Sequence, residues 1–456
     1  MSFVKDILNS VEKLLGGAIG EIFDSVSANG GSKEIDGDFR PGDVNIKGIY
    51  LINEDYTRQY DLLQHVTSID IHESIMCPVI FAEIAIQDTI GVMQNFPIIG
   101  EEYVRVTFST PSSKQDADYI LRVNRVKDKK VQPNNKMVTY VLQCVSPELI
   151  TNAVRYVNTS VEDNIAKVVN DLVSTSVGLE TKKKISVDAT AGIEKIILTR
   201  KQPFVAIDFL RKRAVSSEYQ SSSFVFFENR NGYHFTTIEK LIDVGMKKAG
   251  NDQLTDKQFF FDTNRNLSYD NATLRNILSY NQLTFGDTIS RAQHGGITNI
   301  VNKFDLITGG VTKINYTNNI GADNFKQADT NAAAVNTTTF NRVHGKTTTA
   351  TRLVPVSSDR PETDKAERVS KLMAYAETLA QNIVQIHIYG DSDLTVGDMI
   401  NCTFPASTTV DDDKTVARLD SGNYLISKLR HIILLGDRPQ HTISLELIKG
   451  SLTENA

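Results

Sequence analysis

The sequence predicts a β-dominated α+β fold: two β-barrel domains, the second split by insertions, plus a helical insertion region and an N-terminal amphipathic helix. Three observations support this class. Short strand-like segments fill both ends of the 456-residue chain, the residues between them change to helical spacing, and the two β-rich ends resemble each other. A chain of this length has room for about three domains.

Charge and cysteine content argue against several classes of protein. Lys and Arg number 49 and Asp and Glu 55, which gives a formal net charge of −6. A nucleic-acid coat needs a basic surface, so this balance argues against that class. Cys77, Cys144 and Cys402 lie far apart in apolar runs, which indicates buried free thiols and neither a disulfide framework nor a zinc site. No apolar run reaches membrane-spanning length, and no secretory signal is recognisable.

Residues 1–32 are expected to form an amphipathic helix and a linker. Apolar residues in 4–23 recur three and four positions apart, and a Gly/Ser-rich stretch follows. This apolar stripe could pack on its own domain, lie on a membrane or dock in a groove of another subunit. Its mixed charges attract anionic lipid weakly, which favours docking on a neighbour and no stable membrane association. The residues expected to dock are Val4, Ile7, Leu8, Val11, Leu15, Ile19 and Phe23.

Residues 45–148 are expected to form the first barrel, because short alternating segments are separated there by polar turns. The period then changes, and residues 149–220 are expected to be a helical or mixed domain. Ser160 and Asp163 resemble a capping box ahead of an apolar helical stripe. Pro203 suits the first turn of a second helix.

The second barrel is assigned to two separate stretches. Phe224 to Phe235 is typical of a hairpin, with Asn231-Gly232 as its tight turn. Residues 317–360, rich in Thr, Asn and Ala, predict a long loop or an extended arm. A helix is expected after Asp364, and strands from 383 to 449. The second barrel then comprises 222–240 and 297–449, with 241–296 and 317–382 as insertions.

An internal repeat is the most informative feature. The segment with Tyr103, Val104, Val106 and Phe108 resembles the segment with Ile400, Cys402 and Phe404. Downstream, Asp118 to Leu121 resembles Asn423 to Ile426, which aligns Tyr119 with Tyr424, and similar strands follow each in the same order. These residues are expected on equivalent strands near a ring. Two quasi-equivalent domains per chain allow a trimer to present six, which can dock on a sixfold ring. The alternative is that any two antiparallel β domains look this similar.

Several stretches resemble the central baseplate hub of contractile-tailed bacteriophages. They are Pro203 to Ala214 with the hairpin after it, and Gly390 to Asp398 followed by Gly422 to Ile426 and Arg430-His431. The resemblance implies two tail-tube-type barrels and a homotrimer around a DNA channel, in the tail baseplate of a virion made in the host bacterial cytoplasm. Implied partners are the central spike, the tail tube or tube-initiator protein, the tape-measure protein and surrounding baseplate proteins, with DNA only in transit.

Enzymatic and receptor-binding functions are the alternatives. A hub-associated cell-wall hydrolase would need a facing acid pair, but adjacent side chains such as Glu101-Glu102 point to opposite faces of a strand. Asp411 to Asp413 lie in a polar loop and are typical of a solvated turn. His65, His72, His431 and His441 could be metal ligands, although histidines on a strand face are the simpler interpretation. Phosphate-loop and nucleophile-elbow motifs are missing. We therefore expect a non-enzymatic protein with no catalytic residue, cofactor or metal; a host-receptor-binding tail protein is the third alternative.

Overall fold

The computed structural model describes residues 39–452 apart from 112, 114, 133–136, 249–256, 262–270, 297, 318–330, 333–349, 357–365, 406–416 and 418–419. The seven N-terminal residues expected to dock on a partner therefore lie outside the described residues. The same is true of Asp411 to Asp413.

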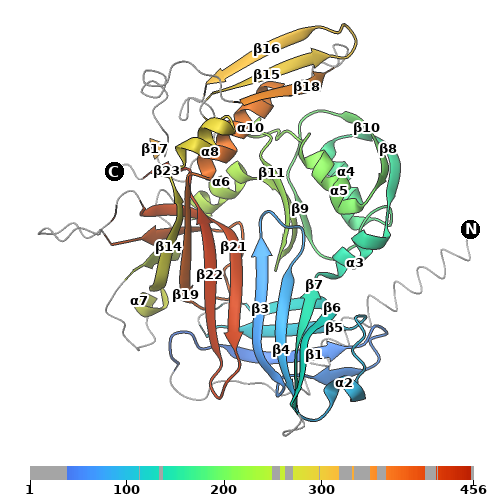
Figure 1. Ribbon diagram of the computed structural model, residues 1–456, viewed down its shortest axis with the longest axis vertical. Helices are drawn as coiled ribbons and strands as arrows, with labels where there is room; N and C mark the ends of the chain where they lie inside the picture. The colour runs from blue at the N-terminus through green and yellow to red at the C-terminus, as the bar shows by residue number, and fades with distance from the viewer. Residues whose placement is uncertain are drawn as a thin grey trace, which may run out of the picture.

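One 13-stranded sheet forms the centre of the molecule. Its strands from β14 to β4 stand side by side across the lower half of Figure 1. In spatial order they are β14 (Ile277–Phe285), β19 (Asn382–Tyr389), β22 (Gln440–Ile448), β21 (Gly422–Leu434), β3 (Val66–Ser74), β4 (Phe81–Asp88), β7 (Met137–Val145), β6 (Ala117–Gln132), β5 (Tyr103–Ser109), β1 (Asn45–Ile52) and β2 (Gln59–Asp61). Off this path, β20 (Met399–Thr403) pairs with β21 and with β13 (Gln258–Phe260).

The sheet contains the same strand pattern twice. One half has the spatial order β3-β4-β7-β6-β5-β1 and the other β14-β19-β22-β21-β20-β13. Strands at corresponding places in the two halves also follow one another in the same order along the chain. We call them the first and second modules. The β-bulges match as well. Strand β6 has one after Val123 in its pairing with β7, and β21 has one after Ile426 in its pairing with β22. The two modules therefore share one topology, as the sequence repeat predicts. One pairing differs, because β13 is parallel to β20 whereas β1 is antiparallel to β5.

Each module has its own apolar core. Alternating residues of β4, β5, β6 and β7 fill the first, and the corresponding residues of β19 to β22 fill the second. The cores also exchange side chains: Ile433 and Leu435 from the second module pack in the first core, and Ile75 from the first packs in the second. The β-dominated α+β class is thus confirmed.

The region 147–211 folds around a third core beside the sheet, on the right of Figure 1. Its helices pack against a two-stranded β10-β8 sheet. The capping prediction was wrong here: Ser160 and Asp163 lie in a strand, and the Asn164 side chain caps the helix by accepting from the Ala166 amide. Pro203 does begin a helix, as predicted. The elements are α3 (Pro147–Val154), β8 (Val157–Asp163), α4 (Ile165–Ser174), β9 (Ile185–Val187), β10 (Glu194–Lys201) and α5 (Pro203–Arg211).

The hairpin β11 (Phe224–Asn229) and β12 (Gly232–Thr237) forms as expected, but its place and turn differ. It pairs with β9 in a three-stranded sheet, whereas it was assigned to the second barrel. Asn229 pairs with Gly232, so the central turn residues are Arg230 and Asn231. Conversely β13 and β14, from the expected insertion 241–296, pair with β20 and β19. The domain boundaries themselves remain a prediction.

The remaining elements surround the second module, except α2, which lies between β4 and β5 and packs on the first core. The three-stranded β16-β15-β18 sheet stands at the top of Figure 1, with the helix predicted after Asp364 (α10) beneath it. Two short strands, β17 and β18, fall in the stretch expected to be a loop or arm. These elements are α2 (Val92–Asn95), α6 (Ile238–Lys248), α7 (Asn271–Leu274), α8 (Thr288–Gln293), β15 (Thr298–Asp305), β16 (Val311–Thr317), β17 (Asn331–Ala332), β18 (Ala350–Val356), α10 (Ala366–Leu379) and β23 (Ser451–Leu452).

Candidate functional site

The joint between the two modules is the central feature of the sheet. Strand β21 pairs through its first part with β20 and through its second part with β3 of the first module, antiparallel. Ile433 lies opposite Ile69, and both are fully buried. Across the joint the Arg430 guanidinium donates to Asp70, at 3.0 Å from Nε to Oδ1. Backbone pairing therefore joins the modules without a break in the sheet.

A buried polar network lies behind this joint. The Tyr119 hydroxyl donates to Glu73 Oε1 at 3.0 Å and lies 3.3 Å from His431 Nε2. His431 Nδ1 lies 3.0 Å from His441 Nε2. All four side chains are at least 97% buried, with exposures between 0% and 3%. The network joins β3 and β6 of the first module to β21 and β22 of the second.

Burial determines the protonation of this network. It raises the pKa of Glu73 to about 7, although the Tyr119 hydroxyl and the Val396 and Arg230 amides donate to the carboxylate. Burial and the neighbouring His441 hold the pKa of His431 well below its usual value, and burial lowers that of His441 to about 3. Both imidazoles are therefore neutral at pH 7. They suit holding the two modules together better than proton transfer at the surface.

A second set of contacts locks the loops next to the joint. The Thr110 amide donates to Ser392 Oγ at 3.1 Å, and the Arg230 guanidinium donates to the Ser392 carbonyl. Thr110 follows β5 of the first module, Ser392 follows β19 of the second, and Arg230 is in the turn of the β11–β12 hairpin. Three separate parts of the chain thus meet at Ser392.

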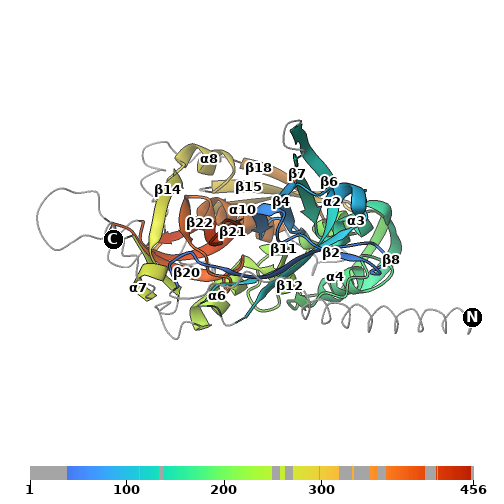
Figure 2. The same ribbon diagram turned by 90° about the horizontal axis from the view of Figure 1, so that it is seen from below.

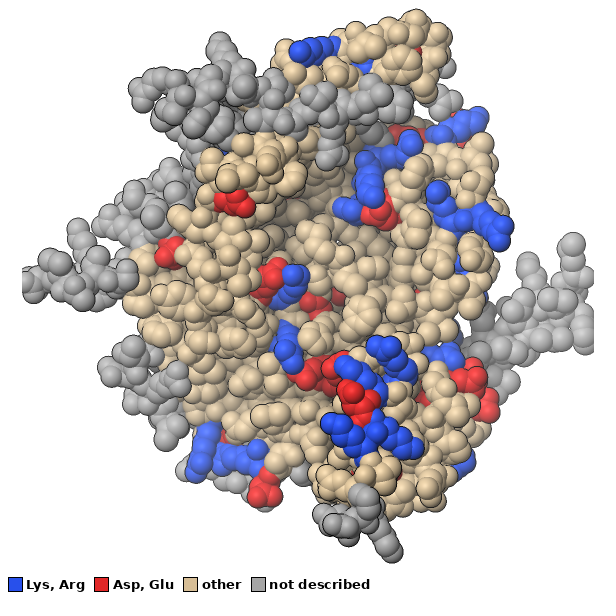
Figure 3. Space-filling view, in the orientation of Figure 1, with Lys and Arg blue, Asp and Glu red and all other residues tan. Residues whose placement is uncertain are grey.

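The face of the sheet over the joint carries paired charges. Arg430 bonds to Asp70, Lys428 to Glu446 at 2.8 Å, and Lys127 to Glu83 at 3.4 Å. Figure 3 shows basic and acidic side chains intermingled over the strands in the centre of the view. This face is hydrophilic, and these three basic side chains are each paired with a carboxylate.

Two strand edges of the central sheet lack a neighbouring strand among the described residues: one side of β14 and the outer half of β6. Strand β14 pairs only with β19 among the described strands, and beyond Arg122 the strand β6 pairs only with β7. Tyr280 on β14 is 40% exposed and Val131 on β6 is 62% exposed. In Figures 1 and 2, β14 and the β6–β7 hairpin lie on opposite sides of the molecule.

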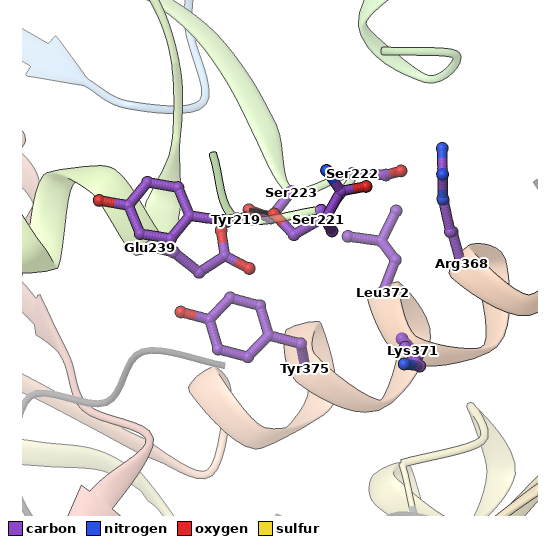
Figure 4. A pocket seen from close by; sticks show the side chains of 10 residues that line it. Tyr219, Ser221, Ser222, Ser223, Glu239, Arg368, Lys371, Leu372 and Tyr375 are labelled. Atoms are coloured by element: carbon purple, nitrogen blue, oxygen red, sulfur yellow. Dashed lines mark hydrogen bonds between the residues drawn. The ribbon is translucent and has the colours of Figure 1, made fainter. Parts of the chain in front are cut away.

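One small cavity, of about 60 Å³, lies between α10, the start of α6 and the loop before β11 (Figure 4). The fully buried Glu239 accepts from the Ser223 hydroxyl, and burial raises the pKa of its carboxyl. Glu239 Oε1 has no hydrogen-bond partner among the described residues. Glu239 is the single carboxylate lining the cavity, so the facing acid pair of a glycosidase is missing there. The space holds about two water molecules.

Residues singled out by the repeat occupy equivalent positions. Three residues of β5 and three of or next to β20 are buried in the two cores, in matching registers against β6 and β21: Val104, Val106, Phe108, Ile400, Cys402 and Phe404. Tyr103 is half-buried and stacks on Tyr56 at 5.2 Å between ring centroids. These residues face the cores and not the sheet edges. Whether their strands surround a ring remains a prediction.

The other candidate residues named from the sequence have contacts typical of structural roles. The Glu102 carboxylate accepts from the backbone amides of Ile99, Gly100 and Glu101, so it holds a turn. His431 and His441 contact each other, a pairing that sequence spacing did not reveal. Among the described residues, no group of three His, Cys, Asp or Glu is placed to hold a metal ion. All three cysteines are free thiols; Cys144 and Cys402 are buried, and Cys77 is partly exposed.

The network was not predicted from sequence. Its only signal was polar residues at apolar positions of strands: Glu73 and His431 fall where the alternation calls for buried side chains. Buried polar groups need partners. One link of this network, from Tyr119 to His431, joins residues 312 positions apart, which no local pattern reveals.

Two solved structures share this architecture. A tail protein from Neisseria meningitidis MC58 is 9% identical with a TM-score of 0.53, covering 88% of this chain and 96% of that chain. The 43 kDa tail protein of prophage MuSo2 from Shewanella oneidensis is also 9% identical with a TM-score of 0.53, covering 88% and 98%. No model of a protein family matches the sequence, and no curated protein matches it. The chain has the fold of phage tail proteins, which confirms the predicted resemblance at the level of the fold.

Proposed function

We propose that this protein is the structural hub of a phage tail baseplate: a trimeric ring that joins the central spike to the sixfold tail tube and lines the DNA channel. The observation that supports this is the pair of topologically equivalent modules joined edge to edge by β3 and β21. Three chains would place six modules around one axis, and alternate contacts between modules would be of similar geometry. Threefold symmetry on one side would then meet sixfold symmetry on the other.

The protein acts by geometry in this proposal, without catalysis, cofactor or metal. Strand ladders hold the bore open, with the β5 and β20 strands at equivalent places around it. The spike binds below. The tube or tube-initiator protein and the tape-measure protein bind above, and other baseplate proteins surround the ring. Its location is the tail of the virion, after synthesis in the host cytoplasm.

DNA contacts the hub only in transit. The paired charges on the central sheet face are consistent with this, because Lys127, Lys428 and Arg430 each have an acidic partner there. Phosphate binding gains from the release of counterions, and basic groups already paired with carboxylates contribute less to it. A wall of this kind lets DNA slide.

The N-terminal segment would attach the hub to a neighbouring subunit or baseplate protein. Its apolar stripe, from Val4 to Phe23, has the spacing of a helix that fills a groove on a partner. Membrane binding is the weaker alternative, because the polar face has mixed charge. No helix among the described residues is long and apolar enough to cross a membrane.

The mass of the purified protein in solution tests the proposal. Sedimentation should give three times the chain mass of 50.6 kDa, and electron microscopy should show a ring with an open bore. A monomer at all concentrations, or a compact particle without a bore, would overturn it. Cell-wall digestion on a zymogram would favour the hydrolase, and direct binding to host cells the receptor-binding tail protein.

A further inference from the structure

We infer that β14 of one subunit pairs antiparallel with the outer half of β6 of the next subunit, in the register that β3 and β21 adopt within the chain. This inference rests on the proposed function and specifies its subunit contact. The occupant of each exposed edge is thus a second copy of the same chain. Within the chain, the joint shows how one module meets the next.

The first step is that these strands are equivalent. Strand β14 occupies in the second module the place of β3 in the first, and both carry a bulge at the same point, after Ile277 and after Val66. Strand β6 likewise corresponds to β21. The half of β21 that pairs with β3 begins at Lys428, and its equivalent in β6 begins at Arg125.

The second step is exposure. Ile69 and Ile433 face each other across the joint and are both 0% exposed. Their equivalents are Tyr280 and Val131, which are 40% and 62% exposed in the single chain. Placing β14 beside β6 in the same register sets Tyr280 opposite Val131 and removes both apolar surfaces from water.

The third step is length. Compared with β21, β6 has one extra residue between Lys127 and Lys130. Compared with β3, β14 also has one extra residue, between Gln282 and Thr284. With Lys127 opposite Thr284 and Lys130 opposite Asn281, each strand has two residues between the paired positions. The irregularities therefore match each other and would not match the strands of the internal joint.

The side chains on these edges also suit a contact that forms after folding. Strand β14 has no charged residue, whereas the outer half of β6 carries four basic residues and one acidic residue: Arg125, Lys127, Asp128, Lys129 and Lys130. Lysines on an exposed strand oppose indiscriminate pairing of edges. In the proposed contact they lie beside amide and hydroxyl groups, as Lys130 does opposite Asn281, so no buried like charges arise.

Cysteine pairing tests the contact in the full-length protein. The variant Val131→Cys with Tyr280→Cys places one thiol on each edge, and side chains directly opposite in antiparallel strands lie about 5 Å apart at Cβ. Mild oxidation, or a short bifunctional thiol reagent, should convert the chains into covalent dimers and trimers and nothing larger. The matched control is Val131→Cys with Leu306→Cys; Leu306 is 66% exposed in the loop between β15 and β16.

The two proposals fail in different ways. A trimeric mass without covalent linkage in the paired variant, or equal linkage in the control, would overturn the strand contact and leave the trimer intact. A monomeric mass without linkage would overturn both. As a second measurement, Tyr280→Lys should abolish the trimer while Leu306→Lys keeps it; a trimer unaffected by Tyr280→Lys would contradict the contact.

Discussion

Glu73 is a carboxyl group at a position where the strand pattern calls for an apolar residue. It is 2% exposed, and its hydrogen-bond donors come from three other parts of the chain: β6, the β11–β12 turn and the loop before β20. Removing one partner from such a network leaves a buried polar group unsatisfied, which costs about 1–3 kcal/mol. Buried polar residues of this kind specify one arrangement of the modules more than they add stability.

The variant Glu73→Gln should change the pH dependence of stability. Burial places the pKa of folded Glu73 at about 7, above the ordinary value of 4.5, so the folded chain holds a proton that the unfolded chain releases. The stability from this group is complete below pH 4.5 and is lost as the pH rises through 7. Relative to wild type, the variant should therefore gain up to about 3 kcal/mol between pH 4 and pH 8.

Urea unfolding of both proteins across that range measures the difference. Comparing variant with wild type cancels the titration of His431, His441 and other groups, provided that their surroundings stay the same. A parallel shift of the two curves at every pH would mean that Glu73 titrates normally in the folded chain.

The buried apolar residues could be predicted from sequence because the alternation within a single strand is enough to identify them. Val104, Val106 and Phe108 alternate along one strand, and all three are 0% exposed. The contacts of Glu73, Tyr119 and His431 depend on which strands become neighbours. No local pattern contains that information, so the network was missed.

The β11–β12 hairpin shows how an element can be recognised and still be misplaced. The hairpin pattern of Phe224 to Phe235 predicted both strands correctly, but the pairing of β12 with β9 depends on a parallel neighbour far back in the chain. Gly232, at φ +117°, lies so close to this neighbour that an added Cβ would sit 2.2 Å from the Lys184 carbonyl oxygen.

Gly232→Ala should consequently destabilise the protein more than Gly192→Ala. Both glycines have positive φ, but nothing lies within 4 Å of a Cβ added at Gly192. The control should cost about 1–2 kcal/mol from the backbone alone. Gly232→Ala should cost about 2 kcal/mol more, because the backbone must move as well. Denaturant midpoints at constant m-value measure the loss of stability in both variants. Equal losses would show that the backbone at Lys184 moves aside at no measurable cost.

The repeated strands were found from sequence, whereas their alignment was not fully correct. Phe108 and Phe404 correspond as predicted, but Tyr119 was aligned with Tyr424, and the registers instead place Tyr119 with Gly422. Register follows from backbone pairing and bulges, and a slip of two residues keeps the same face of a strand. Sequence alternation cannot detect such a slip.

At the scale of the whole molecule, duplication was the correct inference and the division of the chain was harder to predict. The second module begins with β13 and β14, whose short or polar sequences carry little strand signal. Strand β14 mixes apolar and polar residues, and most of it is exposed in the single chain, so it lacks the alternation of a half-buried strand.

Deleting residues 1–32 tests the proposed role of the N-terminal segment at this scale. Each module has an extensive apolar core among the described residues, so we expect the truncated chain to keep its circular dichroism spectrum and thermal midpoint. It should bind baseplate partners or assemble into particles less well, as measured by co-purification with the other tail proteins. A truncated chain that assembles at wild-type levels would exclude docking through this segment.

The exchange of side chains between the two cores affects how the molecule can be divided. Ile433 completes the core of the half to which it does not belong, and Ile75 does the same in the opposite direction. Either half produced alone would expose a gap in its interior and a bare strand. We therefore expect the duplicated halves to unfold together in one cooperative transition and not as separable domains.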